Sequence, residues 1–69
     1  MLIKLEGQDG ITYLESNTLA FYEDGIIKCI SVDGDIEEIN PEMAQHVSIF
    51  DHGVLLDKFH IVQNKFVKE

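Results

Sequence analysis

Arginine is absent from this chain of 69 residues, and all five basic residues are lysines. The 13 Asp and Glu residues give a formal net charge of -8 at pH 7. Arginine is the side chain that reads phosphates and guanine edges through paired hydrogen bonds. An acidic excess also repels the nucleic-acid backbone. The composition therefore disfavours direct binding of nucleic acid.

Cysteine is nearly absent, and long apolar runs are missing. Cys29 is the single cysteine, so no internal disulfide can form and nothing demands an oxidising compartment. Met1 to Glu6 carries charges and lacks the apolar run of a signal peptide. The stretches without Asp, Glu or Lys are far shorter than the roughly 20 residues that a membrane helix needs. We therefore expect a soluble, cytoplasmic protein that does not contact a membrane.

The short length limits the size of the hydrophobic core. Hydrophobic residues make up 45% of the chain, which is too many for a disordered tail. A chain of this length is expected to form a single domain, residues 1–69. Cores of this size usually supply only a few kcal/mol, and many small domains gain stability from a partner subunit. We therefore expect a homo-oligomer.

Glycine and aspartate punctuate the chain at short intervals, which is typical of successive β-hairpins. One predicted hairpin joins Leu2 to Glu6 with Ile11 to Glu15. A second surrounds Glu23-Asp24-Gly25, where Gly25 can adopt the left-handed conformation of a hairpin loop. Its strands are predicted at Thr18 to Tyr22 and Ile26 to Val32, and a further short strand at Ile36 to Ile39.

The second half of the sequence is less regular. Asn40-Pro41-Glu42 has a helix cap, a first-turn proline and an acid suited to the helix dipole, which predicts one short helix near 41–46. A third hairpin is predicted from Val47 to Phe50 and Val54 to Leu56. The tail 55–67 fits a helical stripe, but its β-branched residues favour a strand. The predicted class is mainly β, a small curled antiparallel sheet or barrel of hairpins with one short helix. The alternative is an α+β fold with a C-terminal helix.

Metal sites are not predicted. His46, His52 and His60 are separated by six and eight residues, and these gaps match no zinc-binding pattern. The segment that begins with Asp33-Gly34-Asp35 resembles a calcium loop only superficially, because it lacks glycine at the sixth position and glutamate at the twelfth. A tight turn with solvated acids accounts for that segment.

Catalysis has no positive support in the sequence. Cys29 lies between isoleucines and is interpreted as a small buried residue. No phosphate-binding loop, nucleophile elbow or metalloprotease motif occurs. The aromatic residues Tyr13, Phe21 and Tyr22 are attributed to packing, because the lysine-lined groove that a single-strand binder needs is absent. We therefore expect no enzyme activity, no catalytic residue, no metal and no cofactor.

Acidic residues are concentrated in residues 23–42, which hold seven acids and one lysine, Lys28, and thus -6 of the net charge of -8. We predict that they form a partner-binding surface. The candidate residues are Glu23, Asp24, Asp33, Asp35, Glu37, Glu38 and Glu42. The protein would then be a small acidic protein-binding module without catalysis.

A narrower form of this hypothesis is an inhibitor whose acids imitate a phosphate backbone and occupy a basic, nucleic-acid-binding surface of a partner protein. By analogy, such inhibitors are commonly small stand-alone proteins of phage or mobile elements. The alternative is a structural or accessory domain that functions as a homo-oligomer, with the acids serving solubility only.

Overall fold

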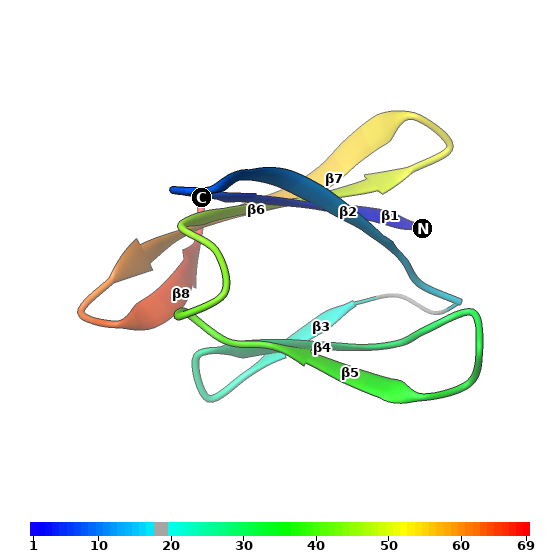
Figure 1. Ribbon diagram of the computed structural model, residues 1–69, viewed down its shortest axis with the longest axis horizontal. Helices are drawn as coiled ribbons and strands as arrows, with labels where there is room; N and C mark the ends of the chain where they lie inside the picture. Colours follow the sequence, from blue (N-terminus) through cyan, green and yellow to red (C-terminus); the bar gives the residue numbers. More distant parts are fainter. Residues whose placement is uncertain (18–19) are drawn as a thin grey trace.

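The computed structural model describes residues 1–17 and 20–69, and these residues form eight strands in two antiparallel sheets (Figure 1). The five-stranded sheet has the order β2-β1-β6-β7-β8, and the three-stranded sheet has the order β3-β4-β5. The strands are β1 (Leu2–Gly7), β2 (Gly10–Glu15), β3 (Phe21–Glu23), β4 (Ile26–Ile30), β5 (Ile36–Ile39), β6 (His46–Asp51), β7 (Val54–Val62) and β8 (Lys65–Lys68).

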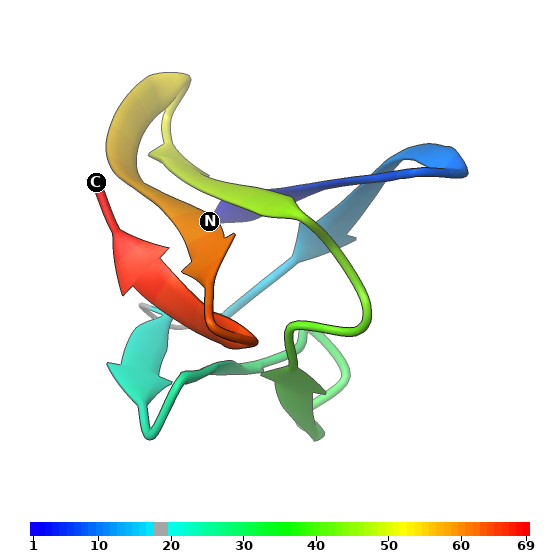
Figure 2. The same cartoon turned by 90° about the vertical axis from the view of Figure 1, so that its left-hand side faces the viewer.

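The core lies between the two sheets, which face one another (Figures 1 and 2). Apolar residues alternate along the strands, so each sheet turns one apolar face inward. The buried hydrophobic residues form one cluster that includes both sheets and the β5–β6 connection. They are Ile3, Val47, Ile49, Phe59 and Phe66 from the larger sheet, Ile27, Cys29 and Ile39 from the smaller, and Ala44 from the connection. The burial of Cys29 confirms its interpretation as a core residue.

Two buried serines join the sheets. Ser16 follows β2, Ser31 follows β4, and they form an isolated antiparallel bridge. The Ser16 hydroxyl donates a hydrogen bond to the carbonyl of Ile30 over 3.1 Å, and the Asn17 amide donates to the same carbonyl over 2.7 Å. Burial of these polar groups is tolerated because they are hydrogen-bonded. The strands form two sheets that do not close into a barrel, so the predicted single curled sheet or barrel of hairpins is wrong in this respect.

The predicted hairpins are confirmed. β1 pairs with β2, β3 with β4, β4 with β5, and β6 with β7. Within the predicted strand from Thr18 to Tyr22, β3 begins at Phe21, and residues 18–19 lie outside the described residues. Two of the turns in these predicted hairpins, Asp24–Gly25 and His52–Gly53, have positive φ at both central residues. Such turns match the twist of a hairpin, which is why they need residues that tolerate positive φ.

The tail consists of strands, so the alternative with a C-terminal helix is wrong. β7 continues to Val62 and pairs with β8 through a turn at Gln63–Asn64. Phe59 and Phe66 are buried while Val62 is exposed, which is the outcome of alternation along strands rather than of a helical stripe.

The predicted short helix near 41–46 is also wrong. Asn40 does act as the expected cap, because its side-chain Oδ1 accepts from the Glu42 amide at 3.1 Å and its carbonyl accepts from the Met43 amide at 3.0 Å. The chain makes only this turn, since Ala44 is buried in the core and β6 begins at His46. Too few residues remain for a helix to propagate.

Candidate protein-binding surface

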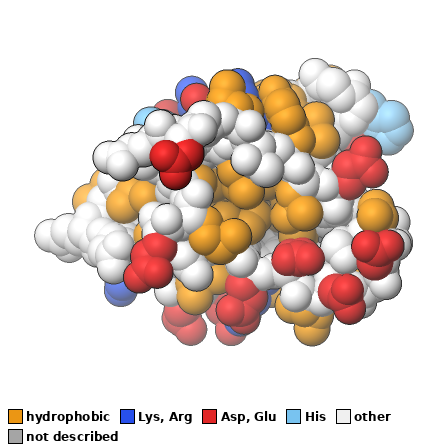
Figure 3. All heavy atoms as spheres, viewed as in Figure 1, with side chains coloured by type: hydrophobic (Ala, Val, Ile, Leu, Met, Phe, Trp, Pro, Cys, Tyr) orange, Lys and Arg blue, Asp and Glu red, His pale blue; other side chains and the backbone are white. Residues whose placement is uncertain are grey.

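The seven acids predicted to bind a partner all belong to the three-stranded sheet or its connections. Glu23 and Asp24 lie in the β3–β4 hairpin, and Asp33 and Asp35 in the β4–β5 connection. The other three are Glu37 and Glu38 of β5 and Glu42 of the β5–β6 connection. Figure 3 shows several acidic side chains along the lower part of the molecule, where this sheet lies, with hydrophobic side chains between them.

The structure divides these acids rather than gathering them on one face. Glu38 is the cross-strand partner of Lys28, whereas Glu37 is the partner of the buried Cys29. Directly opposed residues share a face of the sheet. Glu38 therefore lies on the outer face, away from the core, and the half-buried Glu37 lies on the inner face, as alternation predicted.

The acids of the hairpin and connections lie at the two ends of the sheet. Antiparallel pairing places Asp24 and Glu42 toward one end and Asp33 and Asp35 toward the other. Asp35 is held in a turn, since its amide donates to the Ser31 hydroxyl at 3.3 Å and its carbonyl accepts from the Ser31 amide at 2.8 Å. The sheet thus has acids at both ends and two more, Glu23 and Glu38, on its outer face.

Lys28 lies between the two outer-face acids. Its Nζ is 4.0 Å from Glu23 Oε2 and 3.9 Å from Glu38 Oε1. These distances are long for ion pairs, and both carboxylates are more than half exposed. Partly exposed pairs of this kind contribute at most about 1 kcal/mol. The acids therefore stay accessible to a stronger cationic partner.

Apolar side chains on the same outer face are the feature that sequence reasoning missed. Phe21 is the cross-strand partner of Lys28, and Ile30 is the partner of Ile36. Phe21 is 52% exposed and Ile36 is 74% exposed, the highest value among the exposed large hydrophobics. The alternation of residues along β4 could have predicted this apolar outer face. Ile27 and Cys29 face the core, so the alternate residues Ile26, Lys28 and Ile30 face outward. We call this outer face, with Phe21, Glu23, Ile26, Lys28, Ile30, Ile36 and Glu38, the acidic-apolar face.

The three aromatic residues considered for base stacking lie on separate surfaces. Tyr22 is on the inner face of β3 and stacks on Phe59, with ring centroids 5.9 Å apart and an interplanar angle of 14°. Phe21 is on the acidic-apolar face, and Tyr13 is on the larger sheet. The packing interpretation is confirmed for Tyr22, and the three rings do not form a common platform.

The histidines occupy two places on the larger sheet. His46 and His60 are cross-strand partners in β6 and β7, and His60 Nδ1 is 3.5 Å from Glu69 Oε2. His52 is in the β6–β7 turn, with its Nδ1 2.9 Å from Asp51 Oδ1. Among residues 1–17 and 20–69, no three His, Cys, Asp or Glu side chains are grouped so that they could hold a metal ion.

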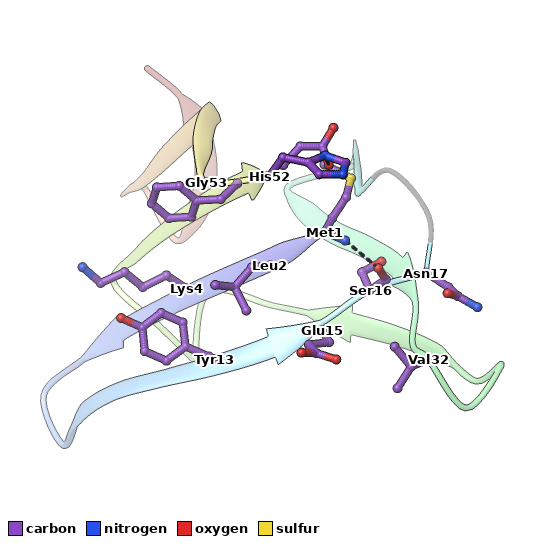
Figure 4. A pocket seen from close by; sticks show the side chains of 12 residues that line it. Met1, Leu2, Lys4, Tyr13, Glu15, Ser16, Asn17, Val32, His52 and Gly53 are labelled. Carbon is purple, nitrogen blue, oxygen red and sulfur yellow. Dashed lines mark hydrogen bonds and ion pairs between the residues drawn. The ribbon is translucent and has the colours of Figure 1, made fainter.

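A hollow on the larger sheet has a mixed lining (Figure 4). Leu2, Tyr13 and Phe50 supply apolar surface, and the imidazole of His52 lies at one side. The α-amino group of Met1 donates to the carbonyl of Ser16 at 2.9 Å, as the dashed line in Figure 4 shows. Most of the lining comes from the larger sheet, Val32 of the β4–β5 connection also contributes, and none of the seven predicted acids is included.

Comparison with known proteins gives no relative: no family model, curated protein or solved structure matches this chain. In the described part of the chain, no helix has the length and apolar character to cross a membrane.

Proposed function

We propose that this protein is a small protein-binding module without catalytic activity, and that its acidic-apolar face contacts a basic partner protein. The observation that carries the proposal is the combination of Phe21, Ile30 and Ile36, all exposed, with Glu23 and Glu38 beside them. Stable interfaces commonly have an apolar centre and a polar rim. Acids around such a centre favour a partner with lysine or arginine around a matching apolar patch.

The charge distribution supports a basic partner in particular. Residues 23–42 carry -6, and the remaining residues carry -2 with four lysines and six acids. The field is therefore strongest near the three-stranded sheet, where it would accelerate encounter with a cationic surface and weaken as salt rises.

The narrower proposal is an inhibitor that occupies a nucleic-acid-binding surface. A partner that normally holds phosphates has the required basic rim. The acids would imitate the charges of a phosphate backbone, and the exposed isoleucines would add an apolar contact with the partner. Displacement of nucleic acid from the captured partner distinguishes this narrower form from ordinary binding to a basic protein.

The proposal is tested with two charge-matched variants. Glu23→Gln/Glu38→Gln removes two charges from the acidic-apolar face, and Asp9→Asn/Glu15→Gln removes two charges from the β1–β2 hairpin of the other sheet. Wild type and both variants are immobilised and exposed to lysate of the native host. The captured protein is then purified and titrated with each chain at low and high salt.

We expect the Glu23/Glu38 variant to bind the captured partner at least about tenfold more weakly at low salt, with a reduced salt dependence. The Asp9/Glu15 variant should bind much as wild type does. Lys28→Gln makes the acidic-apolar face more negative and should strengthen binding. Equal affinities for all four chains at both salt concentrations would refute the proposal.

The alternative function, an accessory domain that works as a homo-oligomer, is favoured by a separate feature. Strand β2 has an edge that pairs with nothing else in the described part of the chain. This feature lies on the other sheet, away from the acidic-apolar face.

A further inference from the structure

Within the described residues each of the two sheets has two edge strands, and three of these four edges are protected. An open edge exposes backbone donors and acceptors that can pair with another chain. β3 is only three residues long and ends in Glu23, and β5 contains Glu37 and Glu38. Like charges on paired strands repel one another, so neither edge favours a second copy of itself.

The edge at β8 is protected by lysines and by the β3–β4 turn, which lies against it. β8 begins with Lys65 and ends with Lys68, and lysine on an edge strand opposes pairing. The Phe66 amide donates to the carbonyl of Gly25 at 3.3 Å, which places the β3–β4 turn against this edge. The side chain of Lys65 also packs against Gly25: if residue 25 carried a Cβ atom, that atom would lie 3.0 Å from Cγ of Lys65.

The edge at β2 has none of these protections. β2 is six residues long and has no charged residue before Glu15, which ends it. It contains no proline or lysine, and its register with β1 has no bulge. Ile11 and Tyr13 are 56% and 57% exposed on the outer face beside this edge. The central sequence Ile-Thr-Tyr-Leu has the β-branched and aromatic residues that strands prefer.

The hydrogen-bond pattern shows which donors of β2 point outward. Met1 and Ser16 exchange both backbone bonds, each 2.9 Å long. In an antiparallel ladder such pairs alternate with pairs that do not exchange bonds. Every second residue before Ser16 therefore belongs to a bonded pair, so the backbone groups of Leu14 and Thr12 bond to β1. The amides of Ile11 and Tyr13 therefore point away from β1, toward the free edge.

We propose that β2 pairs antiparallel with β2 of a second copy of this chain, so that the two five-stranded sheets become one continuous sheet. In a dimer with two-fold symmetry, the outward backbone amides of each β2 strand donate hydrogen bonds to carbonyls of the other. Ile11 and Tyr13 of the two copies are then neighbours on the same face of the sheet. A second copy fits because β2 is almost uncharged and lies on the less charged sheet. Pairing at β2 keeps the two segments of charge -6 apart, whereas pairing at β3 or β5 would bring them together.

This inference deepens the homo-oligomer alternative and is independent of the basic-partner proposal. Wild type is compared with Ile11→Lys/Tyr13→Lys, which adds lysine beside the free edge, and with Tyr13→Pro, which removes one outward amide. The control is Val54→Lys/Val62→Lys, which replaces two exposed valines of β7 and changes the net charge equally. Mass is measured by light scattering from micromolar to hundreds of micromolar concentration, and melting temperature by circular dichroism.

We expect wild type and the Val54/Val62 control to rise from the monomer mass of 7.9 kDa toward twice that value with concentration. Both β2 variants should dissociate at least about tenfold more readily, because two symmetric contacts are lost at once. A wild type that stays at the monomer mass throughout would overturn the proposal, as would folded β2 variants that dimerise like wild type. If one β2 variant fails to melt cooperatively, the other decides the result. The Glu23→Gln/Glu38→Gln variant should show the same mass as wild type, because its substitutions lie on the other sheet. A wild type that does not dimerise would therefore leave the basic-partner proposal intact.

Discussion

Truncation of Phe66 tests whether one core really holds the two sheets together. Phe66 is fully buried on the last strand, and β8 contacts the β3–β4 turn through the backbone bond to Gly25. Phe→Ala substitutions in cores cost about 3–5 kcal/mol. A domain of this length has a total stability of roughly 3–10 kcal/mol, from about 0.05–0.15 kcal/mol per residue. We therefore expect Phe66→Ala to be largely unfolded or close to it.

A graded pair of variants makes the measurement quantitative. Phe66→Leu keeps most of the apolar volume and should cost about 1–2 kcal/mol. With a urea slope of about 1 kcal/mol/M for a small protein, its unfolding midpoint should fall by about 1–2 M. Val67→Ala changes the exposed neighbour of Phe66 and should cost less than about 1 kcal/mol.

The assay is urea unfolding followed by circular dichroism. The order of midpoints should be wild type, then Val67→Ala, then Phe66→Leu, with Phe66→Ala lowest or without a transition. Equal midpoints for Phe66→Leu and Val67→Ala would show that β8 does not anchor the core, and the two-sheet packing would then need revision.

Two further substitutions probe a core position and a turn. Cys29→Ala should cost about 1 kcal/mol and leave partner binding unchanged, because Cys29 is 1% exposed within the core; rapid labelling of native Cys29 by a thiol reagent, with loss of binding on substitution, would contradict this. Asn64→Gly should stabilise the protein by up to about 1 kcal/mol, because Asn64 has a φ of 62° and glycine adopts positive φ without a steric cost. An unchanged or lower melting temperature for Asn64→Gly would show that strain at this turn is negligible.

The sequence by itself determined the local elements. Asp24–Gly25 and His52–Gly53 were recognisable as turns because few residues tolerate positive φ, and both have it in the structure. Alternation in β4 and β5 correctly separated Glu37 from Glu38. The turn at Gln63–Asn64 was missed because it contains no glycine, and its conformation comes from the pairing of β7 with β8.

Only the tertiary structure decided how these elements combine. The cap at Asn40 predicted a helix, but burial of Ala44 and the pairing of β6 with both β1 and β7 left the segment only one turn. The placement of Glu23 and Glu38 on either side of Lys28 depends on three strands in register, which no local pattern encodes. Ile36 is exposed because a chain of 69 residues forms one layer of core between its two sheets, and the outer face of each sheet then remains in contact with solvent.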